Sequence, residues 1–198
     1  MKILVIGASG TIGKAVVASL SARHEIIQAT RTHTPLAVDI ADKASIARLY
    51  DGLGKLDAVV CVGGSARSRP LLELSDEDFQ FSFGNKLMGQ LNLMRLGLDK
   101  LSDGGSFTFT TGIFSRKPVV KTAAIALVNG GIEAFVRAAA LELPRGIRIN
   151  AVSPGWVRES LVARGADATH SIPAAKVAAR YVEAIEGKMS GETLAADE

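Results

Sequence analysis

The sequence predicts one α/β domain, with a doubly wound, mainly parallel seven-stranded sheet flanked by helices. Two observations lead to this prediction. Short apolar runs alternate with segments of helical periodicity along nearly the whole chain, and parallel strands need such crossover connections. The first run, Lys2 to Ile6, is unbroken and stops at a glycine, as strands buried on both faces do. With 198 residues, 47% of them apolar, residues 1–198 have the size and composition of a single domain.

The remaining elements follow in order from periodicity and from residues that begin or end them. The predicted strands are apolar runs bounded by turn residues. They span residues 2–6, 25–29, 36–38, 57–62, 107–111, 146–152 and 193–196. The predicted helices carry apolar residues three and four positions apart and span residues 12–20, 43–50, 75–104, 122–143 and 173–187. The segment Ser75 to Asp78 has the form of a capping box, and Pro144 and Gly187 each end a helix.

Gly7, Gly10 and Gly13 follow the first strand directly and open the first helix. This context is typical of the dinucleotide-binding loop of a Rossmann domain. Gly7 allows a tight turn, Gly10 lets the backbone approach a pyrophosphate, and Gly13 lets helix and strand pack closely. Backbone N–H groups at the start of the helix would bind the phosphates. The candidate cofactor-binding residues of this loop are Gly7, Ser9, Gly10, Thr11, Ile12 and Gly13.

The end of the second predicted strand carries Arg31 and no acidic residue. An acid at this place would bind the ribose hydroxyls of NAD and repel a 2′-phosphate. Arginine instead presents several N–H donors to a phosphate, so the sequence favours NADP(H) over NAD(H). The alternative is a solvated surface arginine. Asp39 and Ile40, after the third strand, would hold the edge and the face of the adenine.

Composition excludes several classes of protein. The net charge of +3 comes from dispersed basic residues, so no nucleic-acid partner is expected. Cys61 is the single cysteine, the histidines have no metal-ligand spacing, and the first apolar run is too short for a secretory or membrane segment. We therefore expect a cytoplasmic protein with no metal and no membrane partner.

Taken together, these features resemble the short-chain dehydrogenase/reductase superfamily. The resemblance rests on the glycine loop, on Asp39, and on the segments 57–64, 107–111, 150–155 and 191–195. In that family the Pro-Gly turn after the sixth strand lies against the nicotinamide. The resemblance therefore adds Pro154 and Gly155 to the cofactor-binding candidates, together with Val62 and Gly63 after the fourth strand.

The chain departs from the family at the catalytic tetrad of Asn, Ser, Tyr and Lys. Aligning the fifth strand with the family's places Gly112 at the serine position, Ile125 at the tyrosine position and Asn129 at the lysine position, while the asparagine position falls on Lys86. The two tyrosines of the chain stand on other segments. Isoleucine carries no proton, and general acid–base catalysis typically contributes ~100- to 10,000-fold. Ordinary carbonyl reduction is expected to be impaired.

Lys86 and Thr111 are the candidate catalytic residues. A partly buried ammonium near the nicotinamide could stabilise an alkoxide or donate a proton, and a threonine hydroxyl could add a hydrogen bond. The alternatives are a salt-bridged helix lysine and an ordinary strand threonine.

Five basic residues lie in segments that contain no acidic residue. They would follow the fourth and fifth strands and attract anions; the alternative is that they are solvated loop charges. They are Arg67, Arg69, Arg116, Lys117 and Lys121.

Two functions remain open from the sequence, beside a third reading in which the chain is a fold relic that binds no nucleotide. The first is an NADP(H)-binding oxidoreductase of non-standard active site, acting on a small carbonyl, hydroxyl or anionic compound. The second is a catalytically silent dinucleotide-binding sensor or scaffold.

The apolar faces of the helices 86–101 and 122–143 exceed what one sheet face must cover. In the family such helices pair subunits, so we expect a homodimer or homotetramer.

Overall fold

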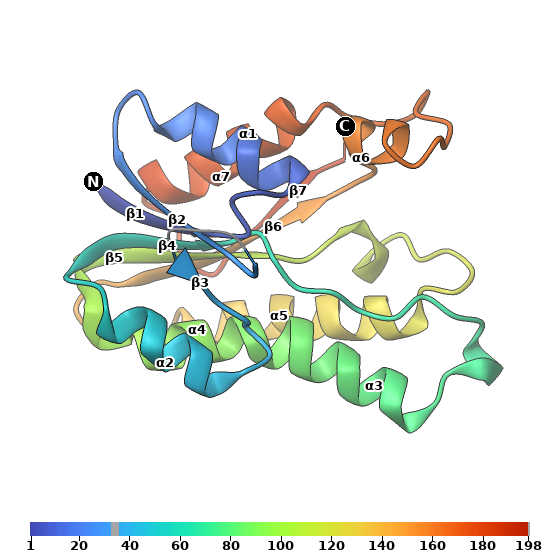
Figure 1. The fold of residues 1–198 in the computed structure, drawn as a ribbon, viewed down its shortest axis with the longest axis horizontal. Helices are drawn as coiled ribbons and strands as arrows, with labels where there is room; N and C mark the ends of the chain where they lie inside the picture. Colours follow the sequence, from blue (N-terminus) through green and yellow to red (C-terminus); the bar gives the residue numbers. More distant parts are fainter. Residues whose placement is uncertain (33–35, 198) are drawn as a thin grey trace.

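A computed structural model of the chain describes residues 1–32 and 36–197. These residues form a seven-stranded sheet in the order β3-β2-β1-β4-β5-β6-β7, and every neighbouring pair is parallel (Figure 1). The strands are β1 (Lys2–Ile6), β2 (Glu25–Thr30), β3 (Leu36–Ala37), β4 (Leu56–Cys61), β5 (Leu101–Thr110), β6 (Arg148–Pro154) and β7 (Thr193–Ala196). The predicted fold class is confirmed. The link between β2 and β3 falls partly outside the described residues.

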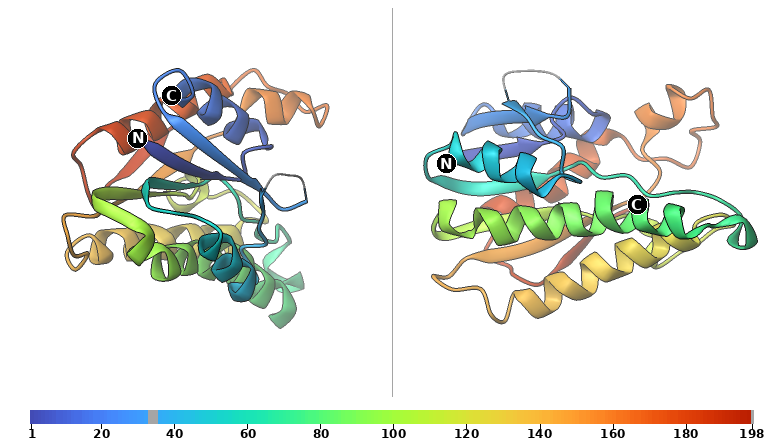
Figure 2. Two further views of the ribbon diagram at one scale, coloured as in Figure 1. Left: turned by 60° about the vertical axis from the view of Figure 1, so that its left-hand side comes forward. Right: turned by 60° about the horizontal axis from the view of Figure 1, so that its bottom comes forward.

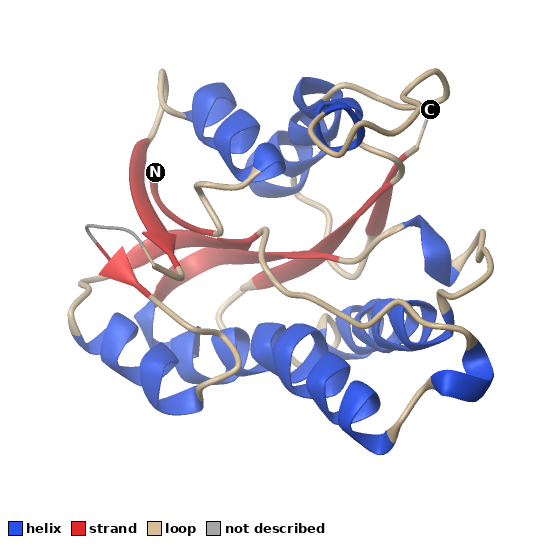
Figure 3. Cartoon of the chain, turned by 45° about the vertical axis from the view of Figure 1, so that its right-hand side comes forward, coloured by secondary structure: helices blue, strands red, loops and turns tan. Residues whose placement is uncertain are grey.

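Helices cover both faces of the sheet and make three layers (Figures 1 and 3). One face carries α1 (Thr11–Leu20) and α7 (Ala174–Glu186); the other carries α2 (Lys43–Asp51), α4 (Gly89–Gly97) and α5 (Ala123–Ala139). Each interface has its own apolar core. None of the helices in the described part of the chain is long and apolar enough to cross a membrane.

Two predicted helices end earlier than expected. The helix expected to run to Gly104 ends with α4 at Gly97 and a 3-10 turn, Leu98–Lys100, so that Leu101 belongs to β5. The helix expected over 122–143 ends at Ala139. The β4–β5 register shifts between Leu56 and Ala58, and Gly104 in β5 has φ +74°. Glycine adopts this positive φ more readily than other residues, so Gly104 suits the irregular start of β5.

Other short elements lie around the carboxyl edge of the sheet. The helix α3 (Asp76–Ser82) begins at the predicted capping box of Ser75 and Asp78. A turn of π-helix, Phe83–Met88, joins α3 to α4. A short helix α6 (Arg158–Val162) follows β6, and 3-10 turns lie at Leu71–Glu73 and Ile113–Ser115. The sequence did not predict the π turn, α6 or the 3-10 turns.

Candidate functional site

The glycine loop between β1 and α1 has the conformation that its residues predict. Gly7 has φ +84°, and a Cβ on it would lie 3.0 Å from the backbone N of Gly63. A Cβ on Gly13 would collide with the carbonyl oxygen of Gly7. The helix begins at Gly10 with no side-chain cap, so the N–H groups of its first turn are left for another acceptor.

Three adjacent cavities follow the carboxyl ends of the strands. The Arg31 cavity, of about 140 Å³, is lined by Ile6, Gly7, Arg31, Val38, Asp39, Ile40, Gly63, Gly64, Ser65 and Asn85. The Ser9 groove is lined by Ser9, Gly10, Thr11, Lys14, Ala15, Glu159, Ala174 and Ala175. The Lys86 cavity, of about 240 Å³, is lined by Ile12, Lys86, Thr110, Thr111, Gly112, Ile113, Phe114, Ile125, Asn129, Pro154, Gly155, Trp156, Val157 and Ser160. All predicted site residues line one of the three except Val62 and Gly13, which lie behind Gly7.

The Arg31 cavity combines an exposed cation with a fixed carboxylate. Asp39 accepts a hydrogen bond from the backbone N of Ala41 at 3.0 Å, and its own N–H donates to Ser45 Oγ. Ile40 is buried, and its Cδ1 would lie 3.9 Å from a Cβ built on Gly63. The cavity thus offers an apolar surface between a carboxylate and an arginine.

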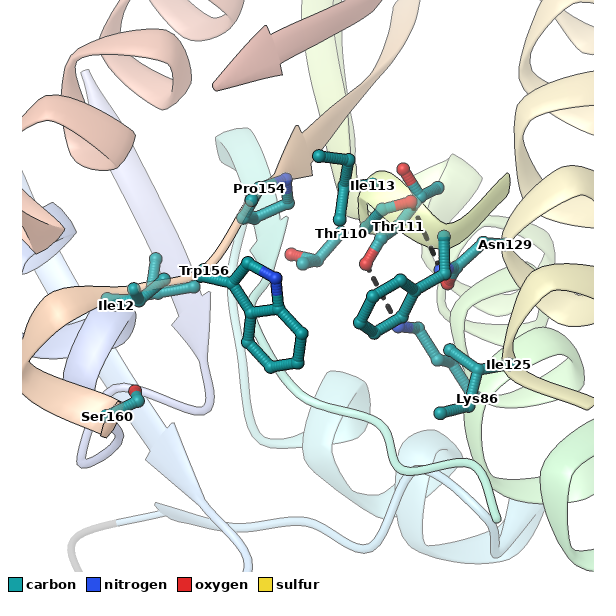
Figure 4. Close-up of a pocket in the computed structure, with 14 residues that line it drawn as sticks. Ile12, Lys86, Thr110, Thr111, Ile113, Ile125, Asn129, Pro154, Trp156 and Ser160 are labelled. Atoms are coloured by element: carbon teal, nitrogen blue, oxygen red, sulfur yellow. Dashed lines mark hydrogen bonds between the residues drawn. The ribbon is translucent and has the colours of Figure 1, made fainter. Parts of the chain in front are cut away.

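Lys86 extends from the π turn into its cavity, as Figure 4 shows. Its Nζ donates to the carbonyl oxygen of Thr111 at 3.0 Å. Burial lowers the pKa of Lys86 to about 8, while the charge of Glu133 acts in the opposite direction. A lysine with this pKa can give up a proton near neutral pH.

Gln90 fixes the π turn to the end of β5. Its buried side-chain Nε2 donates to the carbonyls of Lys86 (3.3 Å) and Thr110 (3.0 Å), and its Oε1 accepts from the N–H of Thr110 at 2.7 Å. A helix widened at one turn is common at functional sites. Here the widened turn directs Lys86 toward the carboxyl edge of the sheet.

The turn after β5 presents two consecutive backbone carbonyls to the cavity. Thr111 O accepts from Lys86, and Gly112 O accepts from Asn129 Nδ2 at 3.2 Å. The Thr111 hydroxyl, expected to face a substrate, donates instead to Val152 O over a long 3.4 Å. A Cβ on Gly112 would lie 3.1 Å from Asn129 Nδ2, so glycine lets this asparagine reach the turn.

Neither tyrosine lines the Lys86 cavity. The Tyr50 hydroxyl donates to Leu93 O at 2.8 Å, and the Tyr181 hydroxyl lies 2.6 Å from Thr110 Oγ1. Burial raises the pKa of both phenols. Ile125 stands in the wall of the cavity. Among the described residues that line this cavity, Lys86 is the one with a titratable side chain.

Aromatic rings close one side of the Lys86 cavity. Phe114 and Trp156 meet edge to face, with ring centroids 5.2 Å apart. Trp156 is 46% exposed and follows the Pro154–Gly155 turn. The cavity therefore joins an apolar wall to a small polar end.

The expected mouth of a single charge sign is wrong, because two carboxylates lie among four of its five basic residues. Asp78 lies within ion-pair distance of Arg67 (3.6 Å) and Arg69 (3.4 Å). Asp197, from the far end of the sequence, pairs with Arg116 (3.7 Å) and Lys117 (3.1 Å). Both carboxylates belong to segments distant in the sequence from their partners, so the local charge pattern does not predict these ion pairs.

The sequence also left several features of the site unassigned. Lys14 lies beside the glycine loop, Gln90 holds the π turn, and Gly64 makes room for Lys86. The four-residue spacing of Lys86 and Gln90 was the available signal, because residues four apart share a helix face. Cys61 is buried, as expected for a packing residue, and burial raises the pKa of its thiol to about 12.

Comparisons with known proteins agree over most of the chain. Residues 10–190 match a family model described as enoyl-(acyl carrier protein) reductase. The chain is 26% identical to L-xylulose reductase of Homo sapiens, over 81% of this chain and 73% of that protein. It is 28% identical to carbonyl reductase family member 4 of Xenopus laevis, over 79% and 75%.

Two solved structures are similar over nearly their full length. The protein lin1944 from Listeria innocua has a TM-score of 0.94 and 45% identity, with 98% of each chain covered. A small-chain dehydrogenase in complex with NADPH has a TM-score of 0.89 and 27% identity, with 100% of this chain and 96% of that one covered. The similarity therefore includes all the elements around the three cavities.

Proposed function

The chain belongs to the short-chain dehydrogenase/reductase family, and from this premise we propose that it is an NADP(H)-dependent oxidoreductase that reduces small carbonyl compounds with a non-standard active site. The observation that carries the proposal is the place of Lys86, whose Nζ lies in a cavity otherwise lined mainly by apolar side chains. Its pKa of about 8 suits proton transfer near neutral pH.

The residues of the glycine loop fit a dinucleotide phosphate. The first turn of α1 carries backbone N–H groups with no side-chain cap at Gly10, and Lys14 adds a positive charge beside them. Such a helix start favours an anion. The Ser9 groove would hold the pyrophosphate, with Ser9 and Thr11 beside it.

The Arg31 cavity fits the adenosine end. Ile40 would cover the adenine face, Asp39 would accept from the ring edge, and Arg31 would bind a 2′-phosphate. The similar small-chain dehydrogenase solved with NADPH supports the preference for NADP(H). Pro154, Gly155 and Ile12 would line the nicotinamide end in the Lys86 cavity, with Val62, Gly63 and Gly13 shaping the backbone behind the loop.

The chain's own residues would bind and protonate the substrate oxygen. When bound, a reduced nicotinamide supplies the hydride to the carbonyl carbon and is itself oxidised. The Lys86 ammonium uses one N–H on Thr111 O and keeps two for the substrate. As the C=O π bond opens, the oxygen takes a proton from Nζ, and solvent reprotonates the amine.

Apolar side chains assist this step, whereas the buried Thr111 hydroxyl already donates its one proton to Val152 O and is given no role in it. Ile125, Phe114 and Trp156 form apolar walls that exclude water, which strengthens the electrostatic effect of Lys86. Because two carboxylates offset part of the positive charge near the mouth, we favour an uncharged carbonyl substrate over an anionic one. The names of two relatives, a carbonyl reductase and a xylulose reductase, agree with this choice.

A fluorescence titration with NADPH and NADH, followed by NADPH oxidation with a panel of aldehydes and ketones, tests the proposal. We expect tighter binding of NADPH and measurable turnover. Tight NADPH binding with no turnover on any carbonyl would contradict the enzyme and favour a silent dinucleotide sensor or scaffold. No binding of either nucleotide would contradict both.

We also propose that a second copy of the chain covers part of the outer face of α4 and α5, which lie side by side in Figure 2. Met94, Leu98, Phe135 and Leu143 line a groove of about 450 Å³ on this face. Leu127, on α5, is half exposed. Apolar helix faces of this kind favour a homodimer or homotetramer.

A further inference from the structure

Asn129 carries a buried acceptor that the fold leaves unused. The side chain is fully buried at the base of the Lys86 cavity, on the second turn of α5. Its Oδ1 has no hydrogen-bond partner among the described residues. A buried acceptor that a ligand cuts off from water costs free energy unless the ligand itself donates a hydrogen bond to it.

The orientation of the Asn129 amide is fixed by its other end. Nδ2 donates to Gly112 O at 3.2 Å, and a reversed amide would place its oxygen against that carbonyl. The three other unpartnered buried oxygens of the described residues belong to hydroxyls within β5 and β7, on Ser106, Thr108 and Thr193. None of these three residues lines the cavity, whereas Asn129 does.

The side chains that carry the unused acceptor and the unused donors of Lys86 are bound to consecutive backbone carbonyls. Lys86 Nζ is held by Thr111 O, and Asn129 Nδ2 is held by the carbonyl of the next residue, Gly112. Consecutive Cα atoms are ~3.8 Å apart, and Figure 4 shows the two side chains converging on this turn from different helices. The Lys86 ammonium and the Asn129 amide are thus fixed to adjacent peptide groups of one turn.

We propose that the substrate is an α-hydroxycarbonyl compound, with its carbonyl oxygen on Lys86 and the hydroxyl of the adjacent carbon donating to Asn129 Oδ1. The inference rests on the proposed carbonyl reductase function and adds the substrate class. Asn129 acts as a specificity-determining residue, because a site built to bind a hydroxyl discriminates against the analogue that lacks it. Phe114 and Trp156 line the cavity at its apolar side and receive the rest of the substrate.

Three matched ketones test the proposal: 2-hydroxyacetophenone, acetophenone and 2-methoxyacetophenone. The first donates a hydrogen bond, the second lacks the group, and the third carries an oxygen with no proton. We expect the hydroxy ketone to exceed both others by roughly ten- to a hundredfold in kcat/KM, from the free energy of one unsatisfied buried acceptor. The same order is expected in calorimetric Kd values for the protein saturated with NADP⁺, which measure binding without turnover.

Asn129→Leu removes the acceptor at similar volume and should abolish the preference for the hydroxy ketone while leaving the NADPH Kd unchanged. Ser115→Ala is the control on the same turn: Ser115 Oγ lies 3.2 Å from Gly112 O and 2.7 Å from Glu133 Oε1, and the variant keeps the Asn129 acceptor. It should keep the preference.

Equal binding of the three ketones to the wild type would overturn the proposal, even if Asn129→Leu does not fold. So would a preference that survives Asn129→Leu, or a weakened NADPH affinity in that variant, since the acceptor would then serve the dinucleotide. If no carbonyl is turned over but the hydroxy ketone still binds best, the reductase function fails and the hydroxyl site stands.

Discussion

Gly64 packs so closely against Lys86 that a side chain at position 64 would press on the Lys86 stem. A Cβ on Gly64 would lie 3.2 Å from Lys86 Cγ and 3.3 Å from its Cα. Gly64 also has φ +111°, a region that other residues rarely adopt. The turn after β4 and the π turn are thus fitted to each other, and the position of the ammonium depends on both.

Gly64→Ala should therefore disturb the reaction more than the fold. The added Cβ pushes the Lys86 stem away, and a misplacement near 1 Å can lower activity by ~100-fold. We expect kcat/KM to fall by ~10- to 100-fold, with a modest loss of Tm. Gly54→Ala is the control, because a Cβ there meets nothing within 4 Å. Equal activity of the two variants would contradict the role given to this contact.

Lys86→Met should remove the proton donor and leave cofactor binding intact. Turnover should drop by ~100- to 10,000-fold, the NADPH Kd should stay the same, and Tm should rise because a buried charge is removed. The comparison is Lys55→Met: Lys55 Nζ also donates to a backbone carbonyl, that of Asp99, at 2.9 Å, but outside the cavity. Unchanged turnover in Lys86→Met would disprove its role.

The pH profile of the wild type should reflect Lys86. Reduction needs the protonated amine, and its pKa lies at about 8 because burial lowers it. The kcat/KM for carbonyl reduction should thus be flat below that pH and fall above it, while alcohol oxidation should rise over the same range. The neighbouring Cys61 stays neutral over most of this range, since burial raises the pKa of its thiol to about 12. A profile that is flat up to pH 10 would refute this assignment.

Arg31→Asp should change the choice of nucleotide. Loss of a charged hydrogen bond to the 2′-phosphate, together with repulsion, should weaken NADPH by ~10- to 100-fold and affect NADH little. Arg180→Asp, on the exposed face of α7 where Arg180 pairs with Glu183, serves as the charge-matched control. Titrations that show equal losses for both nucleotides would mean that Arg31 does not contact the phosphate.

Ala138→Glu should separate the subunits. Ala138 lies at the groove between α4 and α5, where a buried carboxylate without a partner is costly. Light scattering should show a larger assembly for the wild type and a monomer for the variant, while Ala179→Glu on α7 should retain the assembly. A wild type that is monomeric at micromolar concentration would rule out the interface.

The features that the sequence predicted best are those that depend on residues close together in the chain. The glycine loop follows from backbone geometry, and the parallel sheet follows from alternating strands and helices, because both are set by neighbouring residues. It also predicted that Ile125, Asn129 and Lys86 stand near one another, through the resemblance of the chain to its family. All three line one cavity.

What it missed depends on contacts between distant segments. Asp197, near the end of the described residues, forms ion pairs with Arg116 and Lys117, and no local sequence pattern connects the three residues. The start of β5 at Leu101 requires a bulge opposite β4. In the sequence, Gly104 and Gly105 at this bulge look like the residues of a turn that would precede the strand. The long bond of the Thr111 hydroxyl to Val152 depends on the pairing of β5 with β6.

The place of Trp156 has a practical consequence. It is the chain's single tryptophan, and its indole stands in the wall of the cavity where the nicotinamide ring would bind. Tryptophan emission overlaps the absorption band of reduced nicotinamide, so resonance energy transfer from this one donor would monitor cofactor arrival and release in real time without any added label.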